Sequence, residues 1–201
     1  MPINNYFEKE FRGYSSNLPV RRSLDLHYSS SQAVRDRIHN ELQLDFGCRC
    51  GYCGWEHEGY GRERFHIDHL NPSLKSTAED GYSNYVFACP ICNTTKGDRP
   101  LKIDPVVNEY SKLFERTSYG KIIIAKGVYG TDAMGMATQT MEILGLDKDI
   151  HGFDYLLMML KNISSAIRKE GLSKTCSEDK DSCDAIVMIF TKFLKRKTIY
   201  R

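Results

Sequence analysis

Two C-x-x-C pairs, Cys50-Gly-Tyr-Cys53 and Cys89-Pro-Ile-Cys92, constrain the fold of this chain more than any other feature. A C-x-x-C turn can direct both thiolates at one ion, and two such turns complete the closed tetrahedral Cys₄ shell of a structural zinc site. Residues 54–88 lie between the pairs, so a substantial element is inserted there. Because structural zinc can supply roughly 10–16 kcal/mol of apparent folding free energy, it suits a segment with little apolar core.

The cysteine pattern leaves alternatives for the ligand set. The run Cys48-x-Cys50-x-x-Cys53 offers three thiolates for two places, and we expect Cys50 and Cys53 because their spacing matches the second pair. His57 is a possible substitute ligand, although a surface histidine is the simpler interpretation. The chain has seven cysteines, an odd number, and in a reducing compartment paired cysteines indicate metal binding before disulfides.

Composition limits the environment and the partners that we expect. The hydrophobic fraction of 41% with nine Phe and twelve Tyr is typical of a folding sequence. The N-terminal residues have no apolar leader and no apolar run is long enough to span a bilayer, so we expect a cytoplasmic protein without a membrane partner. A net charge of +2 does not point to nucleic acid, so such a partner would need local basic patches or a second protein.

Hydrophobic periodicity predicts an α+β fold. Val34, Ile38 and Leu42 predict a helix from Ser31 to about Gly47. Short strands are expected at Arg64 to Leu70 and at Tyr85 to Ala88 as a hairpin, followed by a short helix after Asn93. Downstream, we expect a strand at Lys121 to Lys126 and helices over 132–144, 153–167 and 184–194, the first with Met136, Thr140, Met141 and Leu144 on one face. The predicted division is an N-terminal arm over 1–30, a zinc-stapled core over 31–104 and a mainly helical region over 105–201.

The segment between the cysteine pairs carries a second motif. It contains His66-Ile-Asp68-His69-Leu-Asn-Pro, then Asn84, and the second pair continues as Cys92-Asn93-Thr-Thr-Lys96. In this order, and bracketed by two cysteine pairs, these residues resemble the HNH (ββα-metal) endonucleases. The resemblance covers about a quarter of the chain, from Cys50 to Lys102.

The resemblance implies a role for each motif residue, and the chemistry fits the residue types. His69 would be the general base, since imidazole titrates near neutral pH. Asp68 and Asn93 would supply oxygen ligands to a catalytic Mg²⁺ or Mn²⁺ ion, with substrate phosphate completing the shell. Asn84 would be the structural Asn behind the base, and cleavage would leave 5′-phosphate and 3′-hydroxyl ends. Taken singly, each residue could instead be a buried histidine, a capping residue or a turn residue; His66 could reach the metal or pack beneath the site.

Basic residues flank the motif and could follow a phosphate backbone. DNA is the expected substrate, but the sequence does not distinguish DNA from RNA or single strands from duplex. Any one of these side chains could equally be a solvated surface charge. The predicted nucleic-acid contacts are Arg64, Lys75, Lys96 and Arg99, with Arg62 and Lys102 as further candidates.

Outside the motif a further resemblance is carried by short signals. Asp104-Pro105, Gly120-Lys-Ile122 and the run from Thr140 to Leu146 are similar to PtuB-like proteins, the HNH nucleases of Septu and retron-associated anti-phage systems. This resemblance implies an ATPase partner of the SMC/ABC type and a docking surface on the arm or the C-terminal helices. Asp68 departs from it, because Glu is expected at this position.

Other classes of function compete with the nuclease. A zinc-dependent nucleic-acid or protein-binding subunit without catalysis would be favoured by loss of Asp68, His69 or Asn93, but all three are present. A protein-interaction subunit with a zinc scaffold would be favoured if replacing His69 left function intact. A redox dithiol protein would place its C-x-x-C in a βαβ context, which the pattern lacks.

Overall fold

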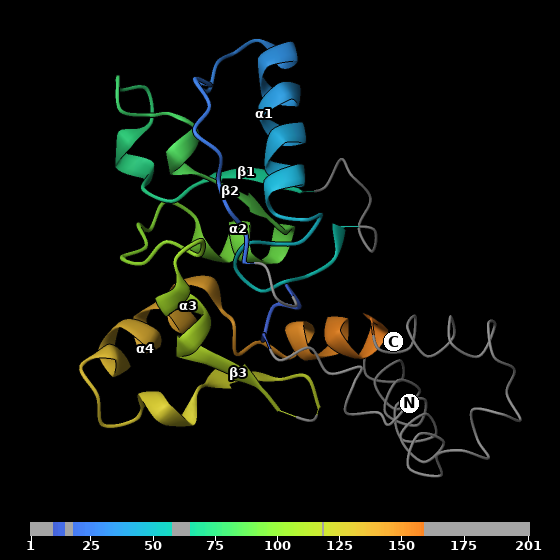
Figure 1. Ribbon diagram of the computed structural model, residues 1–201, viewed down its shortest axis with the longest axis vertical. Helices are drawn as coiled ribbons and strands as arrows, with labels where there is room; N and C mark the ends of the chain where they lie inside the picture. Colours follow the sequence, from blue (N-terminus) through green and yellow to red (C-terminus); the bar gives the residue numbers. More distant parts are fainter. Residues whose placement is uncertain (1–9, 15–17, 58–64, 118, 159–201) are drawn as a thin grey trace, which may run out of the picture.

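The computed structural model describes residues 10–14, 18–57, 65–117 and 119–158. Its upper half in Figure 1 is a small antiparallel sheet with helices on both sides. Strand β1 (His66–His69) pairs with β2 (Tyr85–Ala88), and His69 lies opposite Tyr85 in the register. Helix α1 (Gln32–Asp45) packs on this sheet, and α2 (Pro90–Lys96) packs on β1 from the other side. The predicted hairpin and the mixed α and β composition are therefore confirmed.

Helix α1 follows the predicted hydrophobic stripe. Ile38 and Leu42 are fully buried against the sheet, and Val34 is half-buried. Ser31 takes the N-cap position with extended backbone. Phe46, just beyond the last helical residue, is also fully buried. The helix therefore delivers the chain into the first cysteine pair with its apolar face anchored in the core.

Helix α2 begins earlier than the sequence predicted. We expected it to start after Asn93, but it starts at Pro90, so Asn93 lies inside the helix. The physical reason is the N-terminus of the helix: Cys89 is the N-cap and its Sγ accepts a hydrogen bond from the Cys92 amide. Proline is favoured at the first helical position because its fixed φ suits the helix and its missing N–H is not needed there.

The lower half of the structure contains helices and a second small sheet. Helix α3 (Asn108–Leu113) and strand β3 (Phe114–Arg116) were not predicted; β4 (Ile122–Ile124) lies within the predicted strand and pairs antiparallel with β3. Helix α4 (Ala133–Leu144) agrees with the predicted helix and packs against α2. Its buried face differs in part: Ala137 and Ile143 join Thr140 and Leu144 in the core, while Met136 and Met141 are half-buried.

Short 3₁₀ turns complete the described chain. They are Pro72–Leu74, Tyr82–Asn84 and Lys126–Val128. Residues 149–158 are helical, so the helix predicted over 153–167 begins four residues earlier than expected. The rest of that helix, the predicted helix over 184–194 and Cys176 and Cys183 lie outside the described residues. Among the helices of the described part, none is long and apolar enough to cross a membrane.

The N-terminal arm packs on this same chain where it is described. The Arg12 side chain is buried, and its Nη1 donates hydrogen bonds of 2.7 Å to the carbonyls of Gly51 and Pro105. Further along, Arg21 binds the Asp104 carboxylate. Arg12 therefore joins the arm to the first cysteine pair and to the segment that follows α2, and Arg21 joins the arm to that segment a second time. The proposed division into three parts remains a prediction.

Candidate metal and active site

The four cysteines of the two C-x-x-C pairs form one buried cluster. Their Sγ atoms all lie within 4.8 Å of one another, and each of the four residues is fully buried. The Cys53 and Cys89 sulfurs are 3.7 Å apart, which agrees with the edge of about 3.8 Å expected for a tetrahedron with Zn–S bonds of about 2.3 Å. Cys48 is exposed and outside the cluster. The donor set therefore fits a structural zinc ion.

Backbone contacts tie the two pairs to the hairpin. The Gly51 amide donates to the Phe87 carbonyl on β2 at 2.8 Å, which joins the first pair to the strand that leads to the second. The Arg116 side chain of β3 donates to the Cys53 carbonyl at 2.8 Å. The cluster therefore holds the first turn, the end of β2 and the start of α2 at fixed positions.

Three of the predicted catalytic residues line one cavity of about 450 Å³. Asp68 and His69 come from the end of β1, and Asn93 comes from α2. The cavity also holds Asp80 and Lys75, and it opens beside the ring of Tyr28. The cysteine cluster sets the position of Asn93, because Cys92 is its neighbour on α2. A carboxylate and an amide oxygen in one cavity are a donor set that fits a hard divalent cation.

The Asp68 carboxylate is buried and held by two side chains. The Tyr52 hydroxyl donates to its Oδ2 at 2.5 Å, and the Lys96 ammonium lies 3.2 Å away. Burial raises the pKa of Asp68, while the Lys96 charge and the Tyr52 hydrogen bond oppose that rise. These contacts fix the carboxylate in place, and each oxygen keeps lone-pair capacity for a further partner.

A carboxylate that the sequence analysis missed orients His69. The Asp80 Oδ2 lies 3.2 Å from His69 Nε2, and both side chains are buried. A carboxylate only accepts hydrogen bonds, so Nε2 carries the proton and Nδ1 is left to accept one. Burial lowers the pKa of His69, with Asp80 acting in the opposite direction, and the net effect favours the neutral imidazole. Asp80 precedes β2 in an irregular loop, and no pattern in the sequence linked it to the histidine.

The Asn84 side chain closes the loop between the strands. Its side-chain oxygen accepts from the Asn71 amide at 2.8 Å, and its Nδ2 donates to the Asn71 carbonyl at 3.1 Å. The same Nδ2 donates to Asp80 Oδ1 at 3.2 Å. Asn84 therefore positions Asp80, which in turn positions His69; it does not line the cavity itself.

The predicted nucleic-acid contacts separate in the structure. Lys75 lines the cavity, half-exposed, with its ammonium 3.1 Å from Asp98. Lys96 is a correction: we expected it to contact phosphate, but it is fully buried and its Nζ donates to Asp68 and to the His69 carbonyl. The Arg99 guanidinium donates to the carbonyls of Thr95, Lys96 and Ile143, which join α2 to α4. Arg64 lies outside the described residues.

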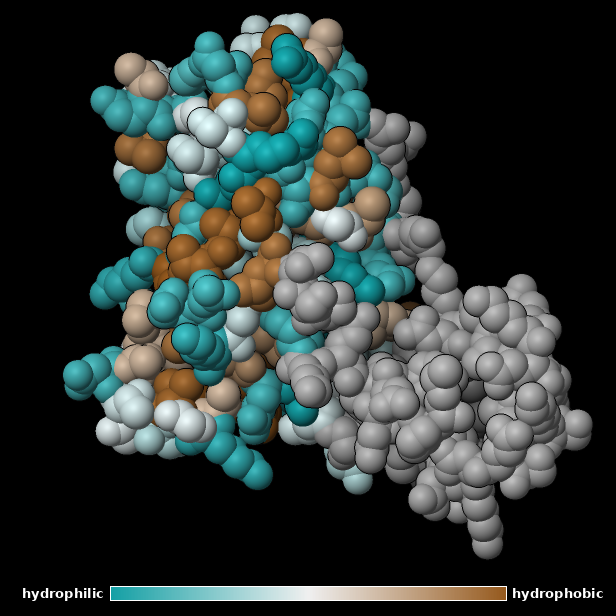
Figure 2. Space-filling model, in the orientation of Figure 1, coloured by the Kyte–Doolittle hydropathy of each residue, from teal (hydrophilic) through white to brown (hydrophobic). Residues whose placement is uncertain are grey.

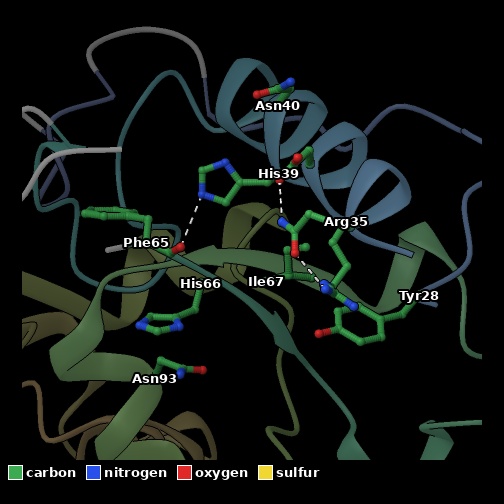
Figure 3. Close-up of a pocket in the computed structure, with 10 residues that line it drawn as sticks. Tyr28, Arg35, His39, Asn40, Phe65, His66, Ile67 and Asn93 are labelled. Atoms are coloured by element: carbon green, nitrogen blue, oxygen red, sulfur yellow. Dashed lines mark hydrogen bonds between the residues drawn. The ribbon is translucent and has the colours of Figure 1, made fainter. Parts of the chain in front are cut away.

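His66 does not line the cavity that contains Asp68, His69 and Asn93. It is exposed and lines a second, neighbouring cavity between α1 and β1. Figure 3 shows its ring between β1 and the Asn93 side chain on α2. His57 is buried among the rings of Phe65 and Phe87, so it is neither a surface histidine nor a member of the cysteine cluster.

Comparison with known proteins agrees with this geometry. Residues 50–99 match the family model of the HNH endonucleases. The matched segment contains both cysteine pairs and the cavity residues of β1 and α2. The match supports nuclease chemistry in general for this segment, with nucleic acid as the substrate and a divalent metal as the cofactor. It spans about a quarter of the chain. No curated protein and no solved structure matches the chain.

Proposed function

We propose that this protein is an HNH endonuclease that hydrolyses phosphodiester bonds in DNA, with a catalytic Mg²⁺ or Mn²⁺ ion and a structural Zn²⁺ ion. The observation that carries the proposal is the cavity in which Asp68, His69 and Asn93 meet, inside the segment that matches the family. In this proposal Cys50, Cys53, Cys89 and Cys92 hold the zinc ion, and Asp68 and Asn93 hold the catalytic cation.

The residues of the cavity supply the steps that hydrolysis of a phosphodiester requires. His69 takes a proton from the attacking water at Nδ1, because Asp80 holds the other ring nitrogen. Asp68 and Asn93 would hold the divalent cation, which when bound would supply positive charge next to the phosphate and the leaving oxygen. Lys96 and Tyr52 hold the Asp68 carboxylate in one orientation. Lys75, at the rim, is placed to contact the phosphate backbone.

The first experiment compares cleavage of plasmid DNA, single-stranded DNA and RNA by the zinc-loaded protein with added Mg²⁺ or Mn²⁺. We expect cleavage that is lost in His69→Ala and Asp68→Ala. Asp132→Ala is the matched control, because Asp132 is exposed and makes no side-chain capping bond to α4. Because Asp68→Ala leaves the buried Lys96 ammonium without its partner, Asp68→Asn is tested beside it: this variant keeps an oxygen for Lys96 and Tyr52, and it should lose cleavage with zinc content and circular dichroism unchanged. Loss of zinc or of fold in that variant would mean that Asp68 is structural, and full activity of His69→Ala would refute the assignment of the base.

We further propose that the enzyme acts in the bacterial cytoplasm as the effector of an anti-phage system, with an ATPase partner. This part rests on the resemblance to PtuB-like proteins, carried by residues such as Asp104-Pro105 and Gly120. The near-neutral charge of +2 also favours a partner that contributes to substrate binding. Co-purification with the product of a neighbouring ATPase gene, and loss of phage resistance in His69→Ala, would support it. Full resistance with His69→Ala would count against a nuclease effector.

A further inference from the structure

A second cavity of about 690 Å³ adjoins the catalytic cavity. One wall is α1, which lies outside the segment that matches the family, and the other is β1. Figure 3 shows Arg35 and His39 extending from the helix toward the strand that carries His66 and Ile67, and Asn40 of the same helix is also part of the lining. Tyr28, Ile67 and Asn93 line both cavities. A group bound in the second cavity would therefore lie next to a phosphate bound in the first.

The charged groups of this cavity are already engaged with protein partners. Arg35 donates to the carbonyls of Ser29 and Ser30 and to the Gln32 side chain. The Asp36 carboxylate accepts a hydrogen bond from Gln32 at 2.8 Å. One cation and one anion leave little net field, so the cavity is poorly suited to a phosphate group. It is better suited to an uncharged polar ligand.

The remaining lining offers an aromatic ring and polar groups. Tyr28 is 46% exposed, and its ring packs edge-to-face with the His69 ring, with centroids 5.5 Å apart. Asn40 and His66 are exposed and present an amide and an imidazole to the cavity. An aromatic face with nearby hydrogen-bonding groups is the combination with which proteins hold a nucleobase outside a helix. The volume is also within the range of small-ligand sites, about 300–1,000 Å³.

We infer that this cavity binds an unpaired nucleotide of the substrate strand, next to the scissile phosphate. A base can enter it only by leaving the stack of a duplex, which costs energy that a single strand does not have to supply. The preferred substrate is therefore a single strand, or a duplex with an unpaired nucleotide at the cleavage position. The inference rests on the proposed nuclease function and adds the strandedness of its substrate.

The test measures binding without cleavage, in full-length, zinc-loaded protein that carries His69→Ala. The probes are a fluorescein-labelled single-stranded DNA, an RNA of the same sequence and the corresponding DNA duplex, followed by fluorescence anisotropy. Asn40→Trp fills the cavity from α1, and Tyr28→Ala removes the aromatic face. Leu44→Trp is the matched control, because Leu44 is an exposed residue of the same helix that does not line the cavity. Zinc content and circular dichroism establish that each variant is folded.

We expect Asn40→Trp and Tyr28→Ala each to weaken single-strand binding by about tenfold or more, with Leu44→Trp within about twofold of the parent. Duplex binding should not change in Asn40→Trp. The DNA and RNA arms show which sugar is accepted. Unchanged single-strand binding in Asn40→Trp, equal loss of single-strand and duplex binding, or no single-strand binding by the parent would each overturn the inference. Because no cleavage is needed, failure of the nuclease proposal would be seen separately, as absence of cutting by the unmodified protein.

Discussion

Gly54 allows the chain to pass beside the N-terminal arm, and its replacement by Ala tests how much that contact stabilises the fold. Gly54 has a φ of +77°, and a Cβ there would lie 2.0 Å from the Arg12 carbonyl oxygen. Gly130 has the same φ of +77° and nothing within 4 Å of its Cβ position. Both substitutions impose the same backbone strain, roughly 1–2 kcal/mol. Only Gly54→Ala must also displace the arm.

The structure gives the size of that second effect. The Arg12 backbone has to retreat by more than 1 Å, because ordinary contact begins at 3.4 Å. The guanidinium donates hydrogen bonds of 2.7 Å to Gly51, Pro105 and Ser111, and a shift of this size would break at least two of them. Bonds from a charged donor contribute about 1.5–3 kcal/mol each, so the loss of two costs about 3–6 kcal/mol beyond the strain. For a chain of this size the extra fall in Tm is on the order of 10 °C.

The assay is thermal denaturation of the zinc-saturated proteins, followed by circular dichroism. We expect Gly130→Ala to lower Tm by a few degrees and Gly54→Ala by much more. Arg12→Met removes the same hydrogen bonds without changing the backbone at Gly54, and it provides a second measurement if Gly54→Ala does not fold. Equal Tm values for the two alanine variants would show that the arm does not stabilise the cysteine cluster region.

Three further predictions concern stability and metal binding. Cys89→Ser should release the zinc ion and unfold the core, whereas Cys48→Ser, which lies outside the cluster, should leave zinc content and Tm unchanged. A stable, zinc-free Cys89→Ser protein would contradict the assignment of a structural zinc site to the four cysteines. Lys96→Met should lower the free energy of unfolding, measured by urea denaturation, by about 3–5 kcal/mol, because it leaves the buried Asp68 carboxylate without its cation. A loss below about 1 kcal/mol would argue against a stabilising ion pair between Lys96 and Asp68. Burial lowers the pKa of His151 to about 4, so between pH 6.5 and pH 4 the unfolded chain binds more protons than the folded chain. The free energy of unfolding should therefore fall by roughly 3 kcal/mol as the pH drops from 6.5 to 4. The same pH dependence in a His151→Gln variant would refute this.

The sequence predicted those parts of the site that short spacings determine. The two C-x-x-C pairs identified the four clustered cysteines, and the motif around Asp68 and His69 identified the cavity residues on β1. Asp80 was missed because it reaches His69 across a loop whose shape depends on Asn84, and no periodic pattern records such a contact.

Local patterns also failed where tertiary contacts decide the outcome. Lys96 reads as a surface cation in the sequence, but the helix turns it toward the buried Asp68 carboxylate. Strand β3 has only three residues, Phe114–Arg116, and it exists because β4 pairs with it. Tyr28 has no motif of its own and gains significance only from its position between two cavities.

The cysteine cluster and the proposed catalytic cavity would hold two different metal ions, and this affects how a chelator experiment is interpreted. EDTA would remove a catalytic Mg²⁺ ion, but it can also strip zinc from Cys50, Cys53, Cys89 and Cys92, and that loss would disorder α2 and Asn93 with it. Inhibition by EDTA alone therefore does not identify the catalytic ion. Activity that returns on adding Mg²⁺ would point to the cavity, whereas activity that returns only after refolding with zinc would point to the scaffold.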